Sequence, residues 1–320
     1  MNNTLKKIPG MEIFPIVIME NPDVHAAMKL RAVNRDLCNL TTEMGLIGSK
    51  DAELTGNLHD LQTRESRYHT LFMGCDFELS KEITVTKRKK LVDWLILAAF
   101  KMYERPAARK GRPRLDKSCL NLAVHFVDWY VTHTVVPLSK YQLVGTVAMK
   151  IASEGVHGIR YSLKSLSYIT NYSSTEEDIF EMEIKMLQAL TTTLEAPTLA
   201  RTAWLCIEVP TSYDFLYLFL QVANADMQAK RDSAMYWLDI YLINESTMIH
   251  SPSFVAAGVT MLALRSELDR KDWNLTLEYY TSYKQKEVAP LADKMQKIIR
   301  EHTGSDTPEL EKKYDLLKPQ

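Results

Sequence analysis

The sequence predicts an all-α protein with two consecutive helical bundles of similar size. From about Leu91 onward, apolar residues recur at helical spacing, and polar turns separate these stripes. Apolar residues make up 46% of the 320 positions, whereas Gly and Pro account for only 11 and 12. This length suits about two domains of roughly 100 to 200 residues each, and the composition is typical of a folded, helix-rich chain.

The chain divides into four segments along its length. Residues 1–60 contain several prolines and only short helical patterns, which indicates a loosely ordered N-terminal extension. We expect the first bundle, with a preceding helix, at 61–196, the second at 197–303 and a tail at 304–320. The two bundles should meet near Glu195-Ala-Pro197, because proline ends the preceding helix.

Several individual helices carry their own signals. The clearest is Ser174-Thr-Glu-Glu177, which matches a capping box ahead of an apolar stripe that should end before Pro197. The segment Leu138–Ser153 is apolar or small almost all round, as the central helix of the first bundle requires. The stripes that predict the second bundle lie at 215–225, 234–243, 253–264 and 288–299.

Composition excludes several classes of protein. The 39 basic residues balance 40 acidic ones, so bulk charge directs the protein toward neither nucleic acid nor membrane. The four cysteines lie far apart without a CxxC pair, which argues against a zinc site or disulfide framework and favours reduced, intracellular thiols. No apolar stretch reaches about 20 residues and no signal-peptide pattern is present, so we expect neither secretion nor a membrane span.

Catalytic motifs are also missing from the sequence. It contains no Gly-rich phosphate loop, HExxH motif or nucleophile elbow, and its eight histidines show no ligand spacing. His125 and His157 are interpreted as packing or surface residues. Glu176 and Glu177 suit a helix N-terminus, where acidic side chains favour the helix dipole. We therefore expect a protein without catalytic residues, metal or cofactor.

One acidic residue lies within an apolar helical stretch. If Asp128 is buried, its desolvation is costly unless a cation pairs with it. Arg88, about one turn before Leu91, is the candidate partner. The pattern predicts a structural ion pair between Arg88 and Asp128, and the alternative is that Asp128 faces solvent.

Four segments in one order carry a family resemblance. Leu91-Val-Asp-Trp-Leu95 is followed by 121–130, 142–153 and 181–187, and then by Ala196-Pro197. This series resembles the box helices of A- and B-type cyclins, and the resemblance covers roughly 65–301. It implies two five-helix cyclin folds and an Arg–Asp pair at the matching positions. Weaker likeness to the second cyclin box lies at 251–257, 273, 280–283 and 290–295.

The resemblance also implies residues that bind a cyclin-dependent kinase, and here the chain departs from the family. Cyclins typically place a Lys on the third box helix and a Glu on the fifth. Glu183 matches the Glu, whereas Glu154 occupies the Lys position. Two carboxylates at one site repel, but Lys150, one turn before Glu154, could compensate. Either the kinase contact survives in altered form, or the fold no longer activates a kinase.

A groove that docks kinase substrates or inhibitors is the second implied site. Leu91, Trp94 and Gln142 occupy positions that line it in cyclins, although Leu91 and Trp94 could instead be plain core residues. Lys87, Lys89 and Lys90 change its edge, and Leu97 occupies a position that is usually acidic. Like-charge repulsion should therefore disfavour basic docking peptides.

A basic insertion separates the first two box helices at 105–117. Its Gly and two prolines exclude a regular helix. The core Lys110-Gly-Arg112-Pro113, with flanking Arg109 and Arg114, resembles an AT-hook, in which arginines enter a narrow minor groove. The other two interpretations are a solvated loop and a nuclear-import or phosphate-binding patch.

The resemblance implies a regulatory subunit that binds and activates a cyclin-dependent kinase in cell-cycle control, with meiosis as one candidate setting. We expect it in the nucleus, with the cytoplasm as a second candidate location. The kinase supplies all catalysis. The alternative is a non-activating cyclin-fold scaffold that assembles proteins on chromatin, which the changed Lys position and the basic insertion would favour. The sequence does not identify the kinase.

Overall fold

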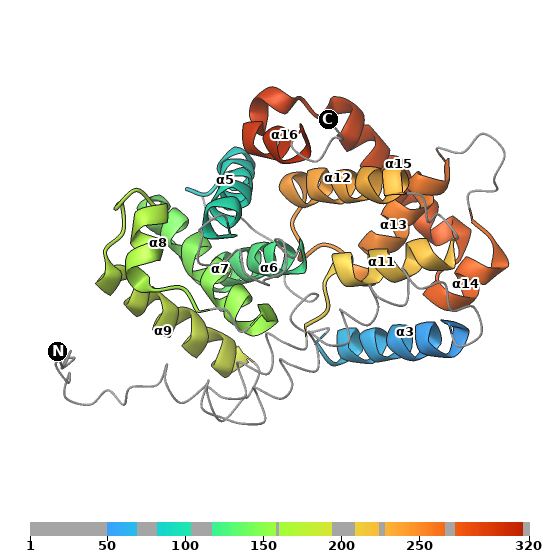
Figure 1. Ribbon diagram of the computed structural model, residues 1–320, viewed down its shortest axis with the longest axis horizontal. Coiled ribbons are helices and arrows are strands. Elements are labelled where there is room, and N and C mark those ends of the chain that lie inside the picture. The colour runs from blue at the N-terminus through green and yellow to red at the C-terminus, as the bar shows by residue number, and fades with distance from the viewer. Residues whose placement is uncertain are drawn as a thin grey trace.

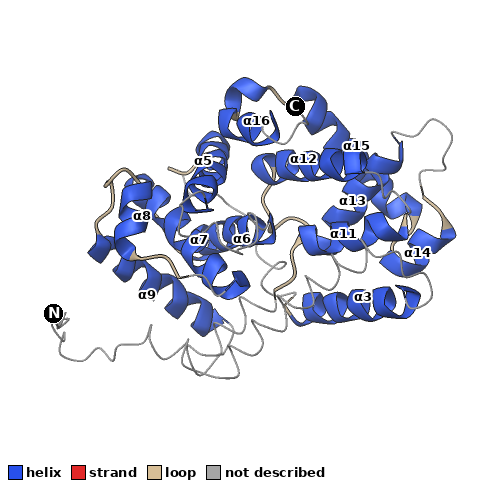
Figure 2. Cartoon of the chain, viewed as in Figure 1, coloured by secondary structure: helices blue, strands red, loops and turns tan. Residues whose placement is uncertain are grey.

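The computed structural model describes residues 50–68, 82–103, 117–157, 160–193, 209–223, 228–265 and 273–315. Within these ranges every regular element is a helix (Figure 2). The helices form two bundles side by side, with the first on the left and the second on the right in Figure 1. The predicted all-α class and the two consecutive five-helix bundles are confirmed.

The first bundle surrounds one central helix. Helix α7 (Tyr141–His157) packs against α5 (Val85–Tyr103), α6 (Lys117–His133) and α9 (Glu176–Thr193), and the short α8 (Leu163–Ile169) packs on α9. Almost every described side chain of α6 and α7 is buried. The stretch predicted at Leu138–Ser153 divides into a 3₁₀ turn, Leu138–Lys140, and α7.

The second bundle repeats this plan around α13 (Pro252–Arg265). Helices α11 (Ser212–Val222), α12 (Gln228–Asn244) and α15 (Gln285–Glu301) pack against it, and α14 (Leu275–Thr281) lies on α11. The predicted stripes fall inside or within a few residues of these four long helices. The seven-residue helices α8 and α14 are too short for a helical period to identify them from sequence.

Each central helix has a glycine at its closest approach to a neighbour. A Cβ on Gly145 of α7 would lie 3.0 Å from Leu91 Cδ1 of α5. A Cβ on Gly258 of α13 would lie 2.9 Å from Met295 Sδ of α15. Both positions therefore let two helices pack closer than a larger residue would permit.

The start of α9 corrects one predicted detail. Its capping box is formed by Thr175 and Asp178, because Asp178 N donates to Thr175 Oγ1 at 3.1 Å and Thr175 N donates to Asp178 Oδ2 at 3.1 Å. The predicted pair Ser174 and Glu177 was wrong by one residue. The error arose because two overlapping segments both match the capping-box pattern. Ser174 is instead buried, and its carbonyl accepts a hydrogen bond from Ser167 Oγ at 2.7 Å.

Helix α3 (Lys50–Arg67) precedes the first bundle in sequence but packs on the second (Figure 1). Leu58 and Leu61 are buried in the second core. The Glu65 carboxylate accepts hydrogen bonds from Ser253 N at 2.8 Å and Ser253 Oγ at 2.6 Å, at the start of α13. The expected boundary at 60/61 falls within this helix, so the chain crosses from the second bundle to the first after α3.

The predicted tail also contains structure that connects both bundles. After a 3₁₀ turn, Gly304–Asp306, helix α16 (Pro308–Asp315) packs against α5. The Asp93 carboxylate of α5 accepts from Leu310 N at 3.0 Å and Glu309 N at 3.3 Å. On its other side, Tyr314 Oη donates to Asp239 of α12 at 2.5 Å.

Replacing Asp93 should loosen α16, because two N–H groups of its first turn would lose their acceptor. For Asp93→Ala we expect faster hydrogen exchange over 304–315 and a free energy of unfolding lower by about 1 to 2 kcal/mol. Asp93→Asn keeps an acceptor oxygen and should lose less. Unchanged exchange in Asp93→Ala would mean that packing alone holds α16.

Candidate functional site

A buried ion pair joins the N-terminal part of α5 to α6. Arg88 Nε lies 2.7 Å from Asp128 Oδ1, and Arg88 Nη2 lies 2.8 Å from Asp128 Oδ2. The two residues are 2% and 0% exposed. Burial by itself lowers the pKa of Arg88, but the attraction and hydrogen bonds of Asp128 outweigh burial and raise it, so the guanidinium stays charged.

The same pair holds the end of α12 in the second bundle. Arg88 Nη1 donates to the carbonyls of Leu242 and Ile243, each at 3.0 Å. Asp128 Oδ2 accepts from Thr247 N at 2.9 Å, Thr247 Oγ1 at 3.1 Å and Ser246 Oγ at 3.2 Å. Both charges are therefore well satisfied, and the cluster fixes the two bundles relative to each other.

The sequence predicted the Arg88–Asp128 pair but not its partners at the end of α12 and just after it. Two of these partners are backbone carbonyls, which carry no sequence signal. Ser246 and Thr247 follow an apolar helix end, and this polar pair was the only available hint.

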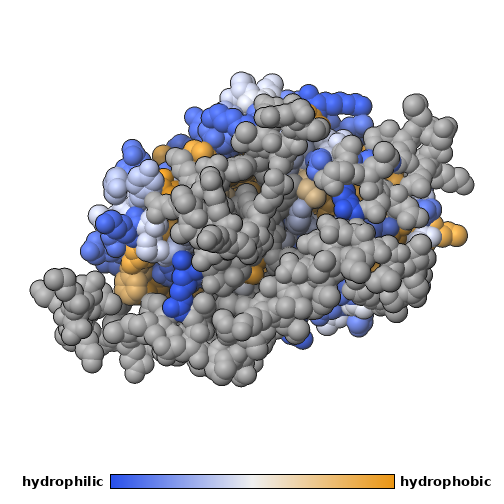
Figure 3. All heavy atoms as spheres, viewed as in Figure 1, coloured by the Kyte–Doolittle hydropathy of each residue, from blue (hydrophilic) through white to orange (hydrophobic). Residues whose placement is uncertain are grey.

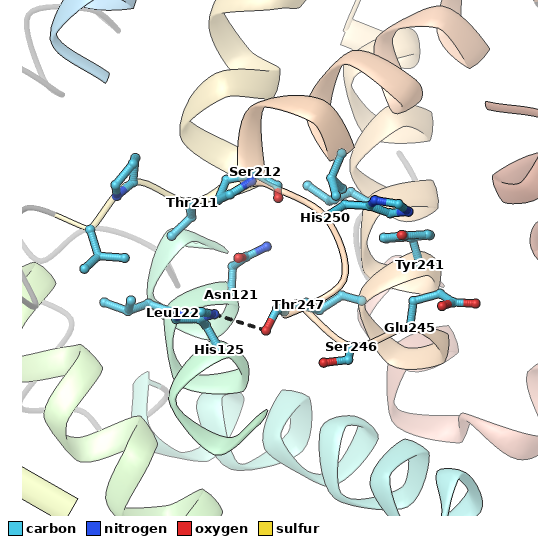
Figure 4. Close-up of a pocket in the computed structure, with 16 residues that line it drawn as sticks. Asn121, Leu122, His125, Thr211, Ser212, Tyr241, Glu245, Ser246, Thr247 and His250 are labelled. Atoms are coloured by element: carbon cyan, nitrogen blue, oxygen red, sulfur yellow. Dashed lines mark hydrogen bonds between the residues drawn. The ribbon is translucent and has the colours of Figure 1, made fainter. Parts of the chain in front are cut away.

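A small cavity lies in the seam between the bundles (Figure 4). Its walls come from α6, the start of α11, the end of α12 and the loop that leads into α13. His125 Nδ1 lies 3.1 Å from Thr247 Oγ1 across it, as the dashed line in Figure 4 marks. The cavity volume of about 20 Å³ suits one water molecule rather than a small-molecule ligand, which needs about 300 Å³ or more.

A second ionic cluster lies where α7 meets α9. Lys150 Nζ is 2.8 Å from Glu154 Oε1, one turn later on α7, and 2.5 Å from Glu183 Oε1 on α9. The Lys150 and Glu183 side chains are 8% and 7% exposed, whereas Glu154 is 22% exposed. The structure thus brings together the three residues assigned to kinase binding from the sequence.

The charges of this cluster depend on one another. Burial alone lowers the pKa of Lys150, but Glu183 and Glu154 outweigh burial and raise it, so Lys150 remains cationic. Burial raises the pKa of Glu183, and the Lys150 charge opposes that rise. Lys150 therefore supplies the cation that two neighbouring carboxylates need, and Glu154 is the member that solvent or a partner reaches most easily.

The three groove residues lie around the α5–α7 contact. Leu91 is 6% exposed and belongs to the core under Gly145, whereas Trp94 is half-buried against that core. Gln142 Oε1 accepts from Ser173 Oγ at 3.2 Å. Trp94 and Gln142 remain partly accessible, so these two could contact a partner.

The predicted basic site is not covered by the structure, because Arg109, Lys110, Arg112 and Arg114 lie outside the described residues. Over the described ranges, no group of three or more His, Cys, Asp or Glu side chains is suited to hold a metal ion. Of the described helices, none has both the length and the hydrophobicity needed to cross a bilayer.

Comparisons with known protein families agree with this architecture. The family model "Cyclin, N-terminal domain" matches residues 57–195, and "Cyclin, C-terminal domain" matches 210–319. These matches place the second half of α3 and α5–α9 in the first domain and α11–α16 in the second.

Individual relatives point the same way. The chain is 28% identical over 246 residues to Cyclin-A1-1 of Arabidopsis thaliana, covering 75% of this chain and 48% of the relative. It is 25% identical over 306 residues to Cyclin-A1-2 of Oryza sativa subsp. japonica, covering 93% and 57%. The chain thus spans about half the length of the curated relatives it matches. The X-ray structure of a viral cyclin from herpesvirus saimiri superposes with a TM-score of 0.54 at 18% identity, covering 75% of this chain and 97% of the viral one.

Breaking the Arg88–Asp128 pair should destabilise the protein strongly, because one buried charge would lose its counterion. We expect Arg88→Met or Asp128→Leu to lower the free energy of unfolding by about 3 to 5 kcal/mol in chemical denaturation. The variant that carries both changes should lose less free energy of unfolding than the two single variants lose together. As a control, Lys297→Met in the exposed Lys297–Glu301 pair should cost less than about 0.5 kcal/mol. Similar small losses at Arg88 and Lys297 would contradict this role.

His125 should make stability depend on pH. Burial lowers its pKa to about 4, with the Asp128 charge opposing. Between about pH 6.5 and 4 the unfolded chain therefore binds a proton that the folded chain excludes. The lowered pKa therefore costs no stability above about pH 6.5, where His125 is neutral in both states. As pH falls from 6.5 toward 4, it lowers the free energy of unfolding progressively. From pH 7 to 4.5, wild type should lose about 2 kcal/mol more than His125→Asn, whereas His59→Asn should follow wild type. Equal losses in all three proteins would refute this assignment.

Proposed function

The chain belongs to the cyclin family, and on that basis we propose that it is a non-catalytic regulatory subunit that binds a cyclin-dependent kinase. The observation that carries this proposal is the Lys150–Glu154–Glu183 cluster between α7 and α9. The cluster lies on two well-packed helices, and its Glu154 and Glu183 occupy the two positions that the family resemblance assigns to kinase contact. Preformed helices need little ordering when they dock, which favours binding.

The chemistry of this contact differs from the usual cyclin arrangement. The cation has moved one helical turn back, from position 154 to Lys150, and a carboxylate now occupies position 154. Lys150 Nζ has two carboxylate partners and three N–H groups, so it can still donate one hydrogen bond. Glu183 and Glu154 each keep acceptor capacity for N–H groups of a partner. The altered cluster can therefore still hold backbone groups of a kinase.

We propose that docking also activates the kinase by population shift. A subunit that binds the active kinase arrangement more tightly than the inactive one shifts the equilibrium toward the active form without taking part in chemistry. Further parts of the proposal are a role in cell-cycle control, with meiosis as one setting, and a nuclear location. Substrates or inhibitors would dock at the Trp94–Gln142 surface.

The alternative function is a scaffold that retains the cyclin fold but does not stimulate a kinase. The observation that favours it is the carboxylate of Glu154, which gives the cluster one cation for two acids. A partner surface that has adapted to a cation at position 154 would meet a carboxylate instead. A measurement of kinase activity in the complex distinguishes the two functions, because a scaffold would bind the kinase without raising its activity.

Reconstitution with a panel of purified cyclin-dependent kinases tests the proposal. We expect at least one kinase to form a complex in size-exclusion chromatography and to phosphorylate histone faster. Glu183→Ala should weaken that complex at least about tenfold, because Lys150 and the partner N–H groups lose a buried acceptor. Glu181→Ala is the matched control, since Glu181 lies on the same helix with a 68% exposed side chain.

The remaining outcomes decide between the two functions. Complex formation without faster phosphorylation would support the scaffold, as would binding that appears only in Glu154→Lys. If no kinase binds wild type or Glu154→Lys, the kinase-binding proposal is wrong.

A further inference from the structure

The N-terminus of α13 is capped by a side chain from a distant helix. Helix α13 begins with Pro252 and Ser253, and the Glu65 carboxylate of α3 accepts from Ser253 N at 2.8 Å and from Ser253 Oγ at 2.6 Å. Acidic groups are favoured there, because the first N–H groups of a helix lack partners and the helix dipole is positive at this end. This cap therefore joins α3 to the central helix of the second bundle.

The residue directly before α13 carries a weakly held hydroxyl. Ser251 Oγ lies 3.4 Å from Tyr283 Oη and 3.5 Å from Ser253 Oγ, which is long for hydrogen bonds between hydroxyls. By contrast, Ser253 Oγ lies 2.7 Å from Tyr283 Oη and Ser253 is almost fully buried. Ser251 is only half-buried and follows His250 in the loop that leads into α13 (Figure 4). Pro252 also disfavours a helical backbone at Ser251, so its hydroxyl lies in a short non-helical segment.

Only two of the 12 prolines in the sequence directly follow a serine or threonine. The two hydroxyl residues are Ser251 and Thr307. Thr307 is 1% exposed, and its Oγ1 lies 3.1 Å from His302 Nε2. A protein kinase that selects proline directly after its acceptor therefore has one accessible target in this chain, which is Ser251.

Carboxylates lie on the side of Ser251 that faces α3 and α15. Burial raises the pKa of Tyr283 and the charges of Glu65 and Glu287 add to that rise, whereas its hydrogen bonds to Ser251 and Ser253 oppose it. A phosphate carries about two negative charges at pH 7. On Ser251 it would lie beside Tyr283, in the field of the same carboxylates.

Two lysines also belong to this region. Lys294, whose charge acts on His250, is paired with Glu245 at 2.9 Å. Lys284 is exposed and follows Tyr283 in the chain. A phosphate that paired with Lys284 would leave the Glu65 cap in place, whereas a phosphate that replaced the cap would displace Glu65. The two outcomes have opposite effects on α3.

Helix α3 packs on the second bundle through one face. Leu58 and Leu61 are buried in the second core, and Gln62 Nε2 donates to the Tyr280 carbonyl at 3.3 Å. The opposite face is exposed, and Figure 3 shows hydrophilic atoms along the lower edge of the molecule, where α3 lies in Figure 1. The Glu65 cap adds hydrogen bonds to a charged group, which are stronger than neutral ones, to this apolar contact.

We propose that Ser251 is a phosphorylation site for a proline-directed protein kinase and that its phosphate releases α3 from the second bundle. Ser251 Oγ attacks the γ-phosphorus of ATP and forms the new O–P bond. The bond from that phosphorus to the β–γ bridging oxygen breaks, ADP leaves with this oxygen, and the hydroxyl proton passes to a base of the kinase.

The phosphate acts on the Glu65 cap in two ways. It is attached directly before α13, so it competes with Glu65 for the Ser253 N–H at the positive end of the helix. It also repels the Glu65 carboxylate, because both groups are negative. Both effects act in one direction, so α13 keeps a capped N-terminus while α3 loses its contact. This inference is independent of the proposed function, since it concerns α3 and the second bundle.

Phosphorylation of the full chain by a purified proline-directed kinase with radiolabelled ATP tests the acceptor. We expect one phosphate, which tandem mass spectrometry places on Ser251, and none in Ser251→Ala. Pro252→Ala should take up phosphate at least about tenfold more slowly, because the residue that the kinase selects is gone. Thr307→Val is the matched control and should be labelled like wild type. Label that persists in Ser251→Ala, or a wild type that takes up none, overturns the site.

Hydrogen exchange of full chains with phosphoserine installed at one position tests the release of α3. Phosphoserine at Ser251 should speed exchange over 50–67 at least about tenfold, because hydrogen bonds to a charged group are lost, and should leave 252–265 unchanged. The matched control is phosphoserine at Ser173, which is exposed on the first bundle and should leave 50–67 unchanged. Slower exchange over 50–67, as expected if the phosphate pairs with Lys284, overturns the inference. Equal effects of the two phosphoserines do so as well.

Glu65→Gln separates the effect on the cap from a general effect of added charge. The neutral amide still offers an oxygen to Ser253, but the phosphate does not repel it. Phosphoserine at Ser251 should therefore speed exchange over 50–67 severalfold less in Glu65→Gln than in the chain with Glu65. An equal acceleration in both chains would contradict the proposed mechanism. These measurements need no bound cyclin-dependent kinase, so failure of the proposed function would leave their result unchanged.

Discussion

The Arg88–Asp128 ion pair is the interaction on which the arrangement of both bundles depends. Its two residues come from the first bundle, yet five further donors and acceptors come from the end of α12 and the residues after it. A fully buried charge pair is stable only when all its hydrogen-bonding groups are satisfied, and the second bundle completes that set. Neither bundle can therefore move relative to the other without leaving a buried charge short of partners. Helix α16 adds a second connection through Asp93 and Asp239.

This rigidity bears on the two surfaces proposed to bind partners. The Lys150–Glu154–Glu183 cluster and the Trp94–Gln142 surface both lie on the first bundle, on α7 and on helices that pack against it. Each departs from the usual cyclin pattern in its charges rather than in its fold. The cation of the cluster has moved by one turn, and the docking surface has become basic. Such changes leave the helical framework intact while they alter which partners fit electrostatically.

Two kinds of feature could be predicted from the sequence: long helices, from their apolar periodicity, and the buried ion pair, from a charged residue within an apolar stretch. Long helices such as α7 and α13 were predictable, and Asp128 pointed to Arg88 because a buried carboxylate needs a cation. Other features depend on contacts between distant segments and could not be predicted. Helix α3 packs on the second bundle through Leu58 and Leu61, and α16 forms where Asp93 can accept from its first turn. The capping residue of α9 was ambiguous because two overlapping motifs both fit.

Hydrogen exchange of the full chain with and without a bound cyclin-dependent kinase tests the central claim most directly. If the Lys150 cluster is the contact, binding should slow exchange in the segments that carry Lys150, Glu154 and Glu183, at the α7–α9 junction. The Trp94–Gln142 surface should keep its exchange rate, since it remains open for a docking segment. Protection confined to the second bundle or to α16, with no change at α7 and α9, would contradict the account.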